Sequence, residues 1–293
     1  MRTVKRIFVP GSEWLYFKIY SGPKMAEKLL INYIYKIILD LDNKKKISKF
    51  FFVRYSDPDF HIRLRFLVTN QESFLLIVTK LNYHLKSLII NNIITKIQID
   101  TYVREIDRYT SPYIEFSEAL FYVDSIYVLK ILKYISKLRN ENYRWMTAIK
   151  LIDSMISEFG LTMEERYTIF SSLDANYMKE FGFDEYNSKQ FNSIYRKWKF
   201  EIEEILQNKF TDKEFVFLDK CIIDRSKSIN EIMIRFKITK IEIINIIPDF
   251  IHMTLNRIFC VSPRLHELIL YNMVKRYYGS QIKKEFYSAK GIK

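Results

Sequence analysis

Hydrophobic and polar residues alternate in four short stretches of the first 106 residues, as they do in half-buried β-strands. The predicted strands are residues 14–20, 49–55, 61–68 and 94–105. Between them, residues 24–41 and 71–89 carry apolar side chains at helical spacing. The order strand, helix, strand, strand, helix, strand predicts a ferredoxin-like βαββαβ antiparallel sheet with both helices on one face. In the usual order of that fold, the first strand lies between the third and the fourth.

From about residue 116 the apolar spacing becomes helical. The predicted helices are residues 117–138, 142–159, 163–181, 186–207, 211–236 and 239–259. Ser262 and Pro263 predict the cap and first turn of a last helix that ends near Tyr278, with a frayed polar tail after Gly279. We therefore expect an α+β fold in which residues 1–293 form a single unit. A sheet part, 1–110, should pack against a mainly helical part, 111–293, that covers the free sheet face.

The third strand carries the most distinctive pattern of the chain. Asp57-Pro58 predicts a tight turn before it. Strict alternation after the turn places Arg63 and Arg65 beside each other on one face. Guanidinium groups grip carboxylate or phosphate with two parallel hydrogen bonds, so this face is a candidate anion site. The alternative is a solvated face whose arginines pair with nearby carboxylates.

The predicted strand order gathers further polar residues on the same face. Lys18 and Tyr16 on the first strand should lie between the Arg63–Arg65 pair and Arg104 of the fourth strand. Because neighbouring strands are about 4.8 Å apart, two strand spacings put Arg104 roughly 10 Å from that pair. A basic cavity would result if helices covered this face.

The segment around Arg104 has an equally good structural explanation. Arg104 and Arg108 are four residues apart, and Glu105 and Asp107 could neutralise either of them. A salt-bridged strand end therefore competes with an anion site at this position.

Two groups in the predicted helices also carry candidate chemistry. His252 and Asn256 are four residues apart in an apolar helix, so they share one face and His252 should be buried. A buried histidine is more often a hydrogen-bonded core residue than a catalyst. Glu118, Asp124 and Ser125 lie near a helix start, where capping and surface charge are the favoured explanation.

Composition indicates a folded protein but does not identify a partner, a disulfide or a metal site. Hydrophobic residues make up 48% of the 293 residues, which is enough for a sizeable core. The formal net charge of +13 attracts anionic partners, but it is spread along the chain and favours none of them. The two cysteines are Cys221 and Cys260, whose separation predicts neither a disulfide framework nor a metal site.

Several common classes of protein find no support in the sequence. We find no signal peptide, no apolar run of the ~18 residues that suggests a membrane span, and no zinc, phosphate-loop, nucleophile-elbow or dinucleotide motif. A cytoplasmic protein without metal or cofactor is expected.

Five segments, taken in order, resemble a known family. They are residues 8–16 (FVPGSEWLY), 54–66 (RYSDPDFHIRLRF), 102–109 (YVREIDRY), the helix with Glu118, Asp124 and Ser125, and 252–257 (HMTLNR). Together they are similar to the C-terminal elimination domain of the tRNA-dependent lantibiotic dehydratases, which also occurs as a stand-alone thiopeptide-type bacteriocin biosynthesis protein. The resemblance covers about residues 8 to 277.

The resemblance implies a carbon–oxygen lyase. Such a domain removes glutamate from glutamylated Ser or Thr of a ribosomal precursor peptide and leaves dehydroalanine or dehydrobutyrine. A separate subunit would attach glutamate from glutamyl-tRNA, so this chain should need no tRNA itself. A homodimer is left open.

The resemblance also implies roles for particular residues. The family's elimination residues match Arg63, Arg65 and Arg104, which would hold the glutamyl group, and His252, which would transfer a proton. We further expect the substrate to contact Lys18, Tyr16, Arg108, Asn256 and Arg257.

Three other functions compete with elimination. Some relatives are thiopeptide pyridine synthases, which join two dehydroalanines and release the leader peptide; these tend to lack the elimination arginines, whereas Arg63, Arg65, Arg104 and His252 are all present here. The chain could instead be a non-catalytic subunit that binds the leader peptide. Nucleic-acid binding rests on charge alone.

Overall fold

The computed structural model describes residues 4–290, apart from the side chains of residues 185 and 186. The chain forms two compact units. The first unit comprises residues 1–138, 227–237 and 256–261, and the second comprises 139–226, 238–255 and 262–293. The first unit thus extends beyond the expected sheet part, because it includes a long helix after residue 110.

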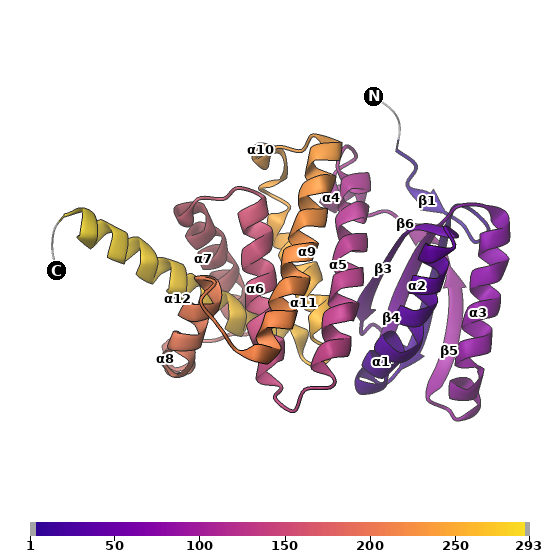
Figure 1. Ribbon diagram of the computed structural model, residues 1–293, viewed down its shortest axis with the longest axis horizontal. Helices are drawn as coiled ribbons and strands as arrows, with labels where there is room; N and C mark the ends of the chain where they lie inside the picture. The colour runs from indigo at the N-terminus through magenta and orange to yellow at the C-terminus, as the bar shows by residue number, and fades with distance from the viewer. Residues whose placement is uncertain (1–3, 291–293) are drawn as a thin grey trace. The chain divides into compact units, whose positions relative to one another are not determined.

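The core of the first unit is a four-stranded antiparallel sheet (Figure 1). Its strands are β2 (Trp14–Ser21), β3 (Ile47–Tyr55), β4 (His61–Val68) and β5 (Ile94–Asp100), in the order β3-β4-β2-β5. The first of these strands pairs with the third and the fourth, as the ferredoxin-like pattern predicted. The α+β class predicted from the sequence is confirmed.

Helices of the first unit pack against the sheet. They are α1 (Pro23–Leu29), a π-helical turn (Leu30–Ile34), α2 (Tyr35–Asn43) and α3 (Gln71–Ile90). Alternation places Phe17, Leu64 and Phe66 on the face opposite the arginines, where they are fully or almost fully buried. The Asn70 side chain accepts a hydrogen bond from the backbone N–H of Ser73 and thereby caps α3.

The predicted strand over residues 94–105 is wrong in one respect: it is two strands in two sheets. The strand β5 ends at Asp100, whose carboxylate accepts a hydrogen bond of 2.7 Å from the Thr101 backbone N–H. That local bond takes a donor away from the ladder. The next segment, β6 (Tyr102–Val103), pairs instead with β1 (Ile7–Phe8). A short helix, α4 (Ile106–Tyr109), follows.

The long helix α5 (Ile114–Ile135) packs against β3. Its Phe121 ring lies 5.5 Å from the ring of Phe51, on the same sheet face as the arginines. The Ser125 hydroxyl accepts a hydrogen bond of 3.2 Å from the Phe52 backbone N–H. The helix therefore covers this face of the sheet at β3. Through Ser125 it also supplies a hydrogen-bond partner for one backbone N–H on the unpaired edge of β3.

Two residues far along the chain complete that edge. The Asn256 side chain accepts a hydrogen bond from the Arg54 backbone N–H and donates one to the Arg54 carbonyl, both at 2.9 Å. The Arg257 Nε donates to the Phe52 carbonyl at 2.9 Å, and its guanidinium pairs with Asp124 at 2.8 Å. An unpaired strand edge exposes donors and acceptors, and here side chains take the place of a fifth strand.

Replacing Asn256 with Ala should therefore destabilise the chain. The loss leaves the N–H and C=O of Arg54 buried and unpaired, which should lower the free energy of unfolding by roughly 2–5 kcal/mol. Urea denaturation measures this effect. The control Asn176→Ala, at an exposed position, should change the free energy by no more than about 0.5 kcal/mol. Equal values for the two variants would show that Asn256 does not hold the edge.

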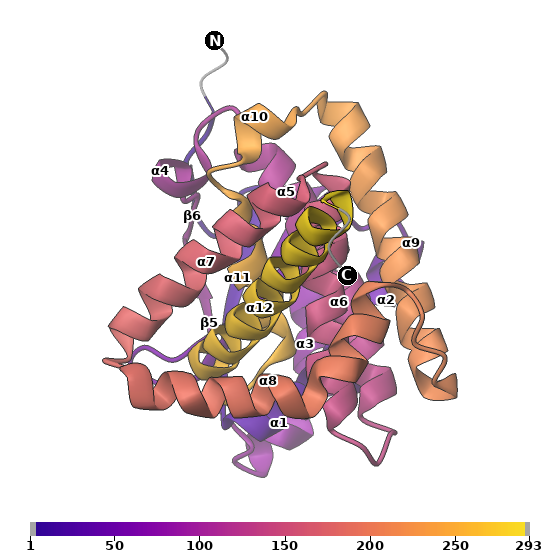
Figure 2. The ribbon, with the colours of Figure 1, turned by 90° about the vertical axis from the view of Figure 1, so that its left-hand side faces the viewer.

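The second unit is built from helices. The helices after α5 are α6 (Asn142–Glu158), α7 (Met163–Glu180), α8 (Glu185–Leu206), α9 (Lys213–Phe236), α10 (Lys240–Ile243), α11 (Ile247–Ile258) and α12 (Pro263–Ala289), of which α9 and α11 contribute residues to both units. Within the second unit, α12 lies beside α7 and also contacts α8 and α6 (Figure 2). In the part of the chain that the structure describes, none of the helices is both long and apolar enough to cross a membrane.

Three predictions about the last helices need correction. The predicted helix over 239–259 breaks into α10 and α11, because Pro248 has no N–H to continue a helical ladder. The last helix does not end near Tyr278 but continues to Ala289, and the predicted tail after Gly279 is helical as far as that residue. Ser262 precedes this helix as expected, but its side chain makes no capping hydrogen bond.

Candidate functional site

The paired strands β2 and β4 create the basic face. Their register sets Tyr16 opposite Arg65 and Lys18 opposite Arg63. Because cross-strand partners point to the same side of a sheet, these four side chains share one face, as the alternation predicted. On the other side of β2, Asp100 and Gln98 are the partners of Tyr16 and Lys18. Arg104 does not belong to this sheet, because β5 ends before it.

Arg65 is held by aromatic rings rather than by acids. Its guanidinium carbon lies 4.7 Å from the ring centre of Tyr16, 5.1 Å from Phe51 and 4.8 Å from Tyr102. The residue is only 7% exposed, and its Nε has no hydrogen-bond partner among the described residues. A buried guanidinium without a carboxylate is costly unless an anion joins it, so Arg65 is well placed to bind one.

Arg63 is oriented by a tyrosine and a histidine. Its guanidinium carbon lies 3.5 Å from the ring centre of Tyr55, and its Nε donates a hydrogen bond of 3.1 Å to His61 Nε2. His61 Nδ1 lies 2.8 Å from the Asp59 carbonyl and so must be the protonated nitrogen. Within residues 4–290, neither Arg63 nor Arg65 forms an ion pair with a carboxylate. The alternative of neutralised surface arginines is therefore not what the structure shows for these two.

The contacts of His61 predict a pH effect. Burial lowers the pKa of His61, so the ring is neutral in the folded chain. In the unfolded chain the His61 ring binds a proton below about pH 6.5. The stability that the neutral ring provides is therefore present above that pH, and it is lost as the pH falls through the lower pKa that His61 has in the folded chain. Urea denaturation across this range should show a weaker pH dependence for His61→Gln, which cannot titrate. His84→Gln, which leaves these contacts intact, should keep the wild-type dependence, and identical slopes in all three proteins would contradict the prediction.

Lys18 completes the strand part of the face and is partly neutralised. Its ammonium group lies 2.5 Å from Asp100, and this hydrogen bond raises the pKa of Lys18 and lowers the pKa of Asp100. Burial raises the pKa of the adjacent Tyr16, which keeps its hydroxyl protonated as a donor. The unbalanced positive charge of the face therefore comes from Arg63 and Arg65.

Arg104 is locked to a buried carboxylate. Its Nε and Nη2 each donate a hydrogen bond of 2.7 Å to Glu118, and the Tyr102 hydroxyl donates to the same carboxylate at 3.0 Å. Glu118 is 0% exposed. Arg104 is thus salt-bridged, as the alternative interpretation expected, but its partner is Glu118. The two acids considered from the sequence pair elsewhere: Glu105 with Arg108 at 3.7 Å, and Asp107 with Arg6 at 2.6 Å.

The expectation that Glu118, Asp124 and Ser125 form a cap and surface charge is wrong. All three are buried on α5. Glu118 binds Arg104, Asp124 binds Arg257, and Ser125 bonds the β3 edge. A helix that is buried over most of its length can carry such acids only where cations pair with them.

The basic face of β2 and β4 borders a cavity of about 460 Å³ in the first unit. It is lined by Arg6, Tyr16, Lys18, Arg63, Arg65, Asp100, Thr101, Val103, Arg104, Glu105, Asp107 and Arg108. The size is within the range of small-ligand sites. The cavity brings together six of the residues predicted from the sequence: Tyr16, Lys18, Arg63, Arg65, Arg104 and Arg108. Asn256 and Arg257 are not part of its lining and instead hold the β3 edge.

His252 belongs to the second unit and has a network of its own. Its Nδ1 lies 2.9 Å from Oε2 of Glu267, which is 0% exposed. The hydroxyls of Tyr271, at 3.0 Å, and Tyr177 donate to the same oxygen, and burial raises the pKa of both tyrosines, so both remain donors. A carboxylate oxygen that accepts these bonds requires a proton on His252 Nδ1, so Nε2 is the nitrogen left to exchange a proton.

The environment of His252 differs from the prediction in its exposure. The side chain is 24% exposed rather than buried. Its polar partner is Glu267, an acid on α12, whereas Asn256, four residues along the same helix, bonds Arg54. A partly exposed imidazole with a buried acid hydrogen-bonded to one ring nitrogen is the arrangement expected of a proton carrier.

Sequence reasoning missed two residues that orient the predicted ones. His61 holds Arg63 and Glu267 holds His252. The alternation of β4 did place His61 on the face of Arg63, which was the available signal. Nothing local marks Glu267, which lies 15 residues from His252. Among the described residues, no group of three or more His, Cys, Asp or Glu is placed to hold a metal ion.

Comparisons with known proteins identify the family of the chain. Residues 14–278 match the family described as "Lantibiotic biosynthesis dehydratase C-term". The chain is 28% identical over 283 residues to the subtilin biosynthesis protein SpaB of Bacillus subtilis, covering 90% of this chain and 25% of SpaB. It is 33% identical over 141 residues to the nisin biosynthesis protein NisB of Lactococcus lactis subsp. lactis, covering 47% of this chain and 13% of NisB. The chain therefore spans a quarter or less of the length of these relatives.

Solved structures share the fold at low sequence identity. The tRNA-dependent lantibiotic dehydratase MibB from Microbispora sp. 107891 matches 96% of this chain and 29% of its own, with a TM-score of 0.70 and 16% identity. The pyridine synthase TbtD from thiomuracin biosynthesis matches 92% of this chain and 99% of its own, with a TM-score of 0.67 and 10% identity. The family match covers most of the chain, and the chain therefore belongs to the family of C-terminal domains of the lantibiotic biosynthesis dehydratases.

Proposed function

We propose that this chain removes glutamate from glutamylated Ser or Thr residues of a ribosomal precursor peptide. The observation that carries the proposal is the pair Arg63 and Arg65, which face a cavity of about 460 Å³ without a carboxylate partner in the described part of the chain. The family and the relatives named for subtilin and nisin biosynthesis support the choice of a modified peptide as substrate.

The chemistry of the step fits an arginine-lined cavity. A base takes the proton from Cα of the modified residue, the electron pair forms the Cα–Cβ double bond, and the Cβ–O bond breaks to release glutamate. Negative charge builds on the peptide carbonyl oxygen and on the departing carboxylate. Fixed cations placed where this charge develops lower the barrier most effectively in a site that is shielded from water.

We assign different tasks to the arginines within this proposal. Arg65, buried among three rings, and Arg63, oriented by His61, would bind the glutamyl carboxylate and the developing charge. Arg104 lines the same cavity but is already bound to Glu118. Its main role would therefore be to hold in place the side of the cavity that Arg104 and Arg108 line. Tyr16 and Lys18 would offer further hydrogen bonds to the substrate.

Proton transfer is assigned to His252. The leaving carboxylate has an ordinary pKa below about 4.5, so it can depart without a proton. The group that needs help is the Cα proton, which calls for a base. Glu267 would hold the proton on Nδ1 of His252, and Nε2 of the neutral ring would take up the Cα proton.

A reaction with a glutamylated peptide tests the proposal. The chain would be co-expressed with the precursor peptide and a glutamylating subunit, and the peptide analysed by mass spectrometry. We expect the glutamylated peptide to be replaced by a product that has lost glutamate and contains dehydroalanine or dehydrobutyrine. Unchanged glutamylated peptide would refute the proposal.

Pyridine formation is the second candidate, because the pyridine synthase TbtD has the same fold. Fold similarity at 10% identity does not carry activity. The same mass spectra separate the two reactions, since a peptide with two dehydroalanines would be converted to a pyridine macrocycle with loss of the leader peptide.

A further inference from the structure

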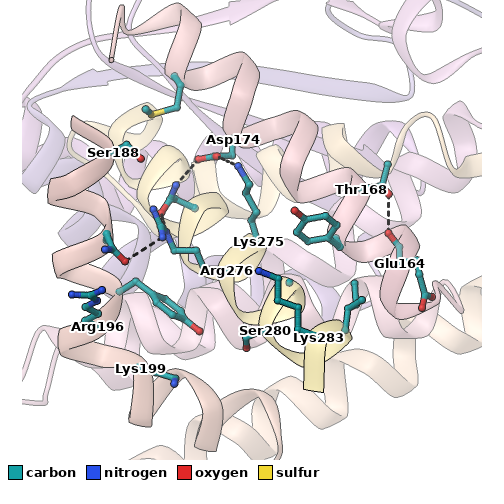
Figure 3. A pocket seen from close by; sticks show the side chains of 17 residues that line it. Glu164, Thr168, Asp174, Ser188, Arg196, Lys199, Lys275, Arg276, Ser280 and Lys283 are labelled. Carbon is teal, nitrogen blue, oxygen red and sulfur yellow. Dashed lines mark hydrogen bonds and ion pairs between the residues drawn. The ribbon is translucent and has the colours of Figure 1, made fainter. Parts of the chain in front are cut away.

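The second unit contains a larger cavity that the elimination chemistry does not use. It measures about 920 Å³ and lies among α7, α8 and α12 (Figure 3). Five cations line it: Arg196, Lys199, Lys275, Arg276 and Lys283. Two carboxylates, Glu164 and Asp174, line it as well.

A buried network fixes the centre of the cavity. Asp174 pairs with Lys275 at 2.6 Å and accepts a hydrogen bond of 2.9 Å from the Asn272 side-chain amide. The Asn272 carbonyl oxygen accepts from Arg276 Nε at 2.7 Å, and the Asn192 carbonyl oxygen accepts from Arg276 Nη1 at 3.3 Å. Two neutral amides therefore hold the Arg276 guanidinium in place, while Asp174 balances only the charge of Lys275.

The other three cations are not neutralised. Arg196, Lys199 and Lys283 are exposed, and they form no ion pair within the described residues. Arg196 and Lys199 lie at one end of the cavity and Glu164 at the other in the view of Figure 3. Together with Arg276, these residues give the cavity four positive charges that no carboxylate neutralises. Of the two acids in its lining, only Glu164 has no ion pair among the described residues.

The walls also include apolar surface. Tyr167, Met178, Tyr195 and Ile282 contribute to the lining. Gly279 of α12 allows the Tyr167 ring of α7 to approach closely, because a Cβ at this position would come within 3.0 Å of Tyr167 Cε2. Glycine is less favourable than alanine inside a helix, and here it allows the Tyr167 ring to form part of the wall.

We propose that this cavity binds an acidic peptide segment that also carries apolar side chains. Acidic side chains would meet Arg196, Lys199, Arg276 and Lys283, and apolar side chains would lie against Tyr167, Met178 and Ile282. An inorganic polyphosphate fits less well, because it has no group to place against the apolar walls, and nucleic acid is an outcome that the test separates. This is a binding function of the second unit, and it holds whether or not the chain eliminates glutamate.

Fluorescence anisotropy tests the proposal with a short labelled peptide that alternates Glu and Leu. We expect saturable binding to the full chain that weakens with added salt. Binding should be lost when Gln replaces Glu in the peptide. Because exposed ion pairs contribute about 0.2–1 kcal/mol each, Arg196→Ala, Lys199→Ala and Lys283→Ala should each raise Kd by about 1.5- to 5-fold, and the triple variant by more.

A matched triple variant controls for net charge. Lys179, Lys189 and Lys220 are exposed residues of the same unit that do not line the cavity, so their joint replacement with Ala should leave Kd within about twofold. Circular dichroism would confirm that both triple variants remain folded. The proposal is wrong if the peptide does not bind, if both triple variants weaken binding equally, or if inorganic triphosphate or oligothymidylate binds more tightly and displaces the peptide.

Discussion

Replacing Arg65 with Ala should reduce the rate of glutamate elimination by about 10²–10³-fold, the loss that follows removal of one donor to a developing oxyanion. Arg65 is a buried guanidinium of the cavity and, unlike Arg104, has no carboxylate to neutralise it within residues 4–290. The proposed reaction places new negative charge where this guanidinium points. The measurement is a quenched time course with a glutamylated peptide, followed by mass spectrometry.

Two further variants make the Arg65 result specific. Arg65→Met keeps most of the side-chain volume among Tyr16, Phe51 and Tyr102 but removes the charge, so it should be as slow as Arg65→Ala. Arg65→Lys keeps a charge but lacks the planar fork and should fall between these variants and the wild type. Arg235, which stacks on Phe236 outside the cavity, serves as the matched control, and Arg235→Ala should retain the wild-type rate. A fully active Arg65→Met would remove the basis of the proposed function.

Replacing His252 with Ala should lower the same rate by about 10²–10⁴-fold, the usual contribution of a positioned acid–base group. The glutamylated peptide should accumulate, because attachment of glutamate does not depend on this residue in the proposed scheme. Matched replacement of His84, which has no place in the proposed reaction, should have no effect. A dehydrated product formed at the normal rate by His252→Ala would rule out proton transfer by this residue.

Glu267 provides a second test of the same assignment. Glu267→Gln preserves the shape of the side chain but removes the carboxylate that holds His252 Nδ1 and accepts from Tyr177 and Tyr271. If Glu267 acts by positioning His252, kcat should fall while KM changes little. In the double variant with His252→Ala, the Glu267 substitution should have no further effect on kcat, whereas a purely structural role for Glu267 would give additive losses.

The prediction of the sheet succeeded because a strand has a period of two residues, which assigns each side chain to a face from sequence alone. The alternation around Arg63 and Arg65 gave the correct face, and the strand order placed Lys18 and Tyr16 beside them. The same reasoning failed at Arg104. One hydrogen bond from Thr101 N–H to the Asp100 carboxylate ends β5, and no hydrophobic pattern records such a bond.

The helices were found from their apolar spacing, but their polar residues were misjudged. Glu118 and Asp124 look like surface acids in a sequence and are in fact buried against Arg104 and Arg257. Local spacing cannot show this, because Arg257 lies 133 residues from Asp124.

The sequence by itself determined the α+β class, the order of strands in the sheet and the face on which Arg63 and Arg65 lie. These features depend on short-range periodicity and on the few ways in which such a set of strands and helices can pack. Only the tertiary structure decided which cations remain without a carboxylate, which side chains replace the missing strand beside β3, and which acid orients His252. Those outcomes depend on contacts between residues far apart in the chain, such as Asn256 with Arg54 across 202 positions, and each is settled only when the chain has folded.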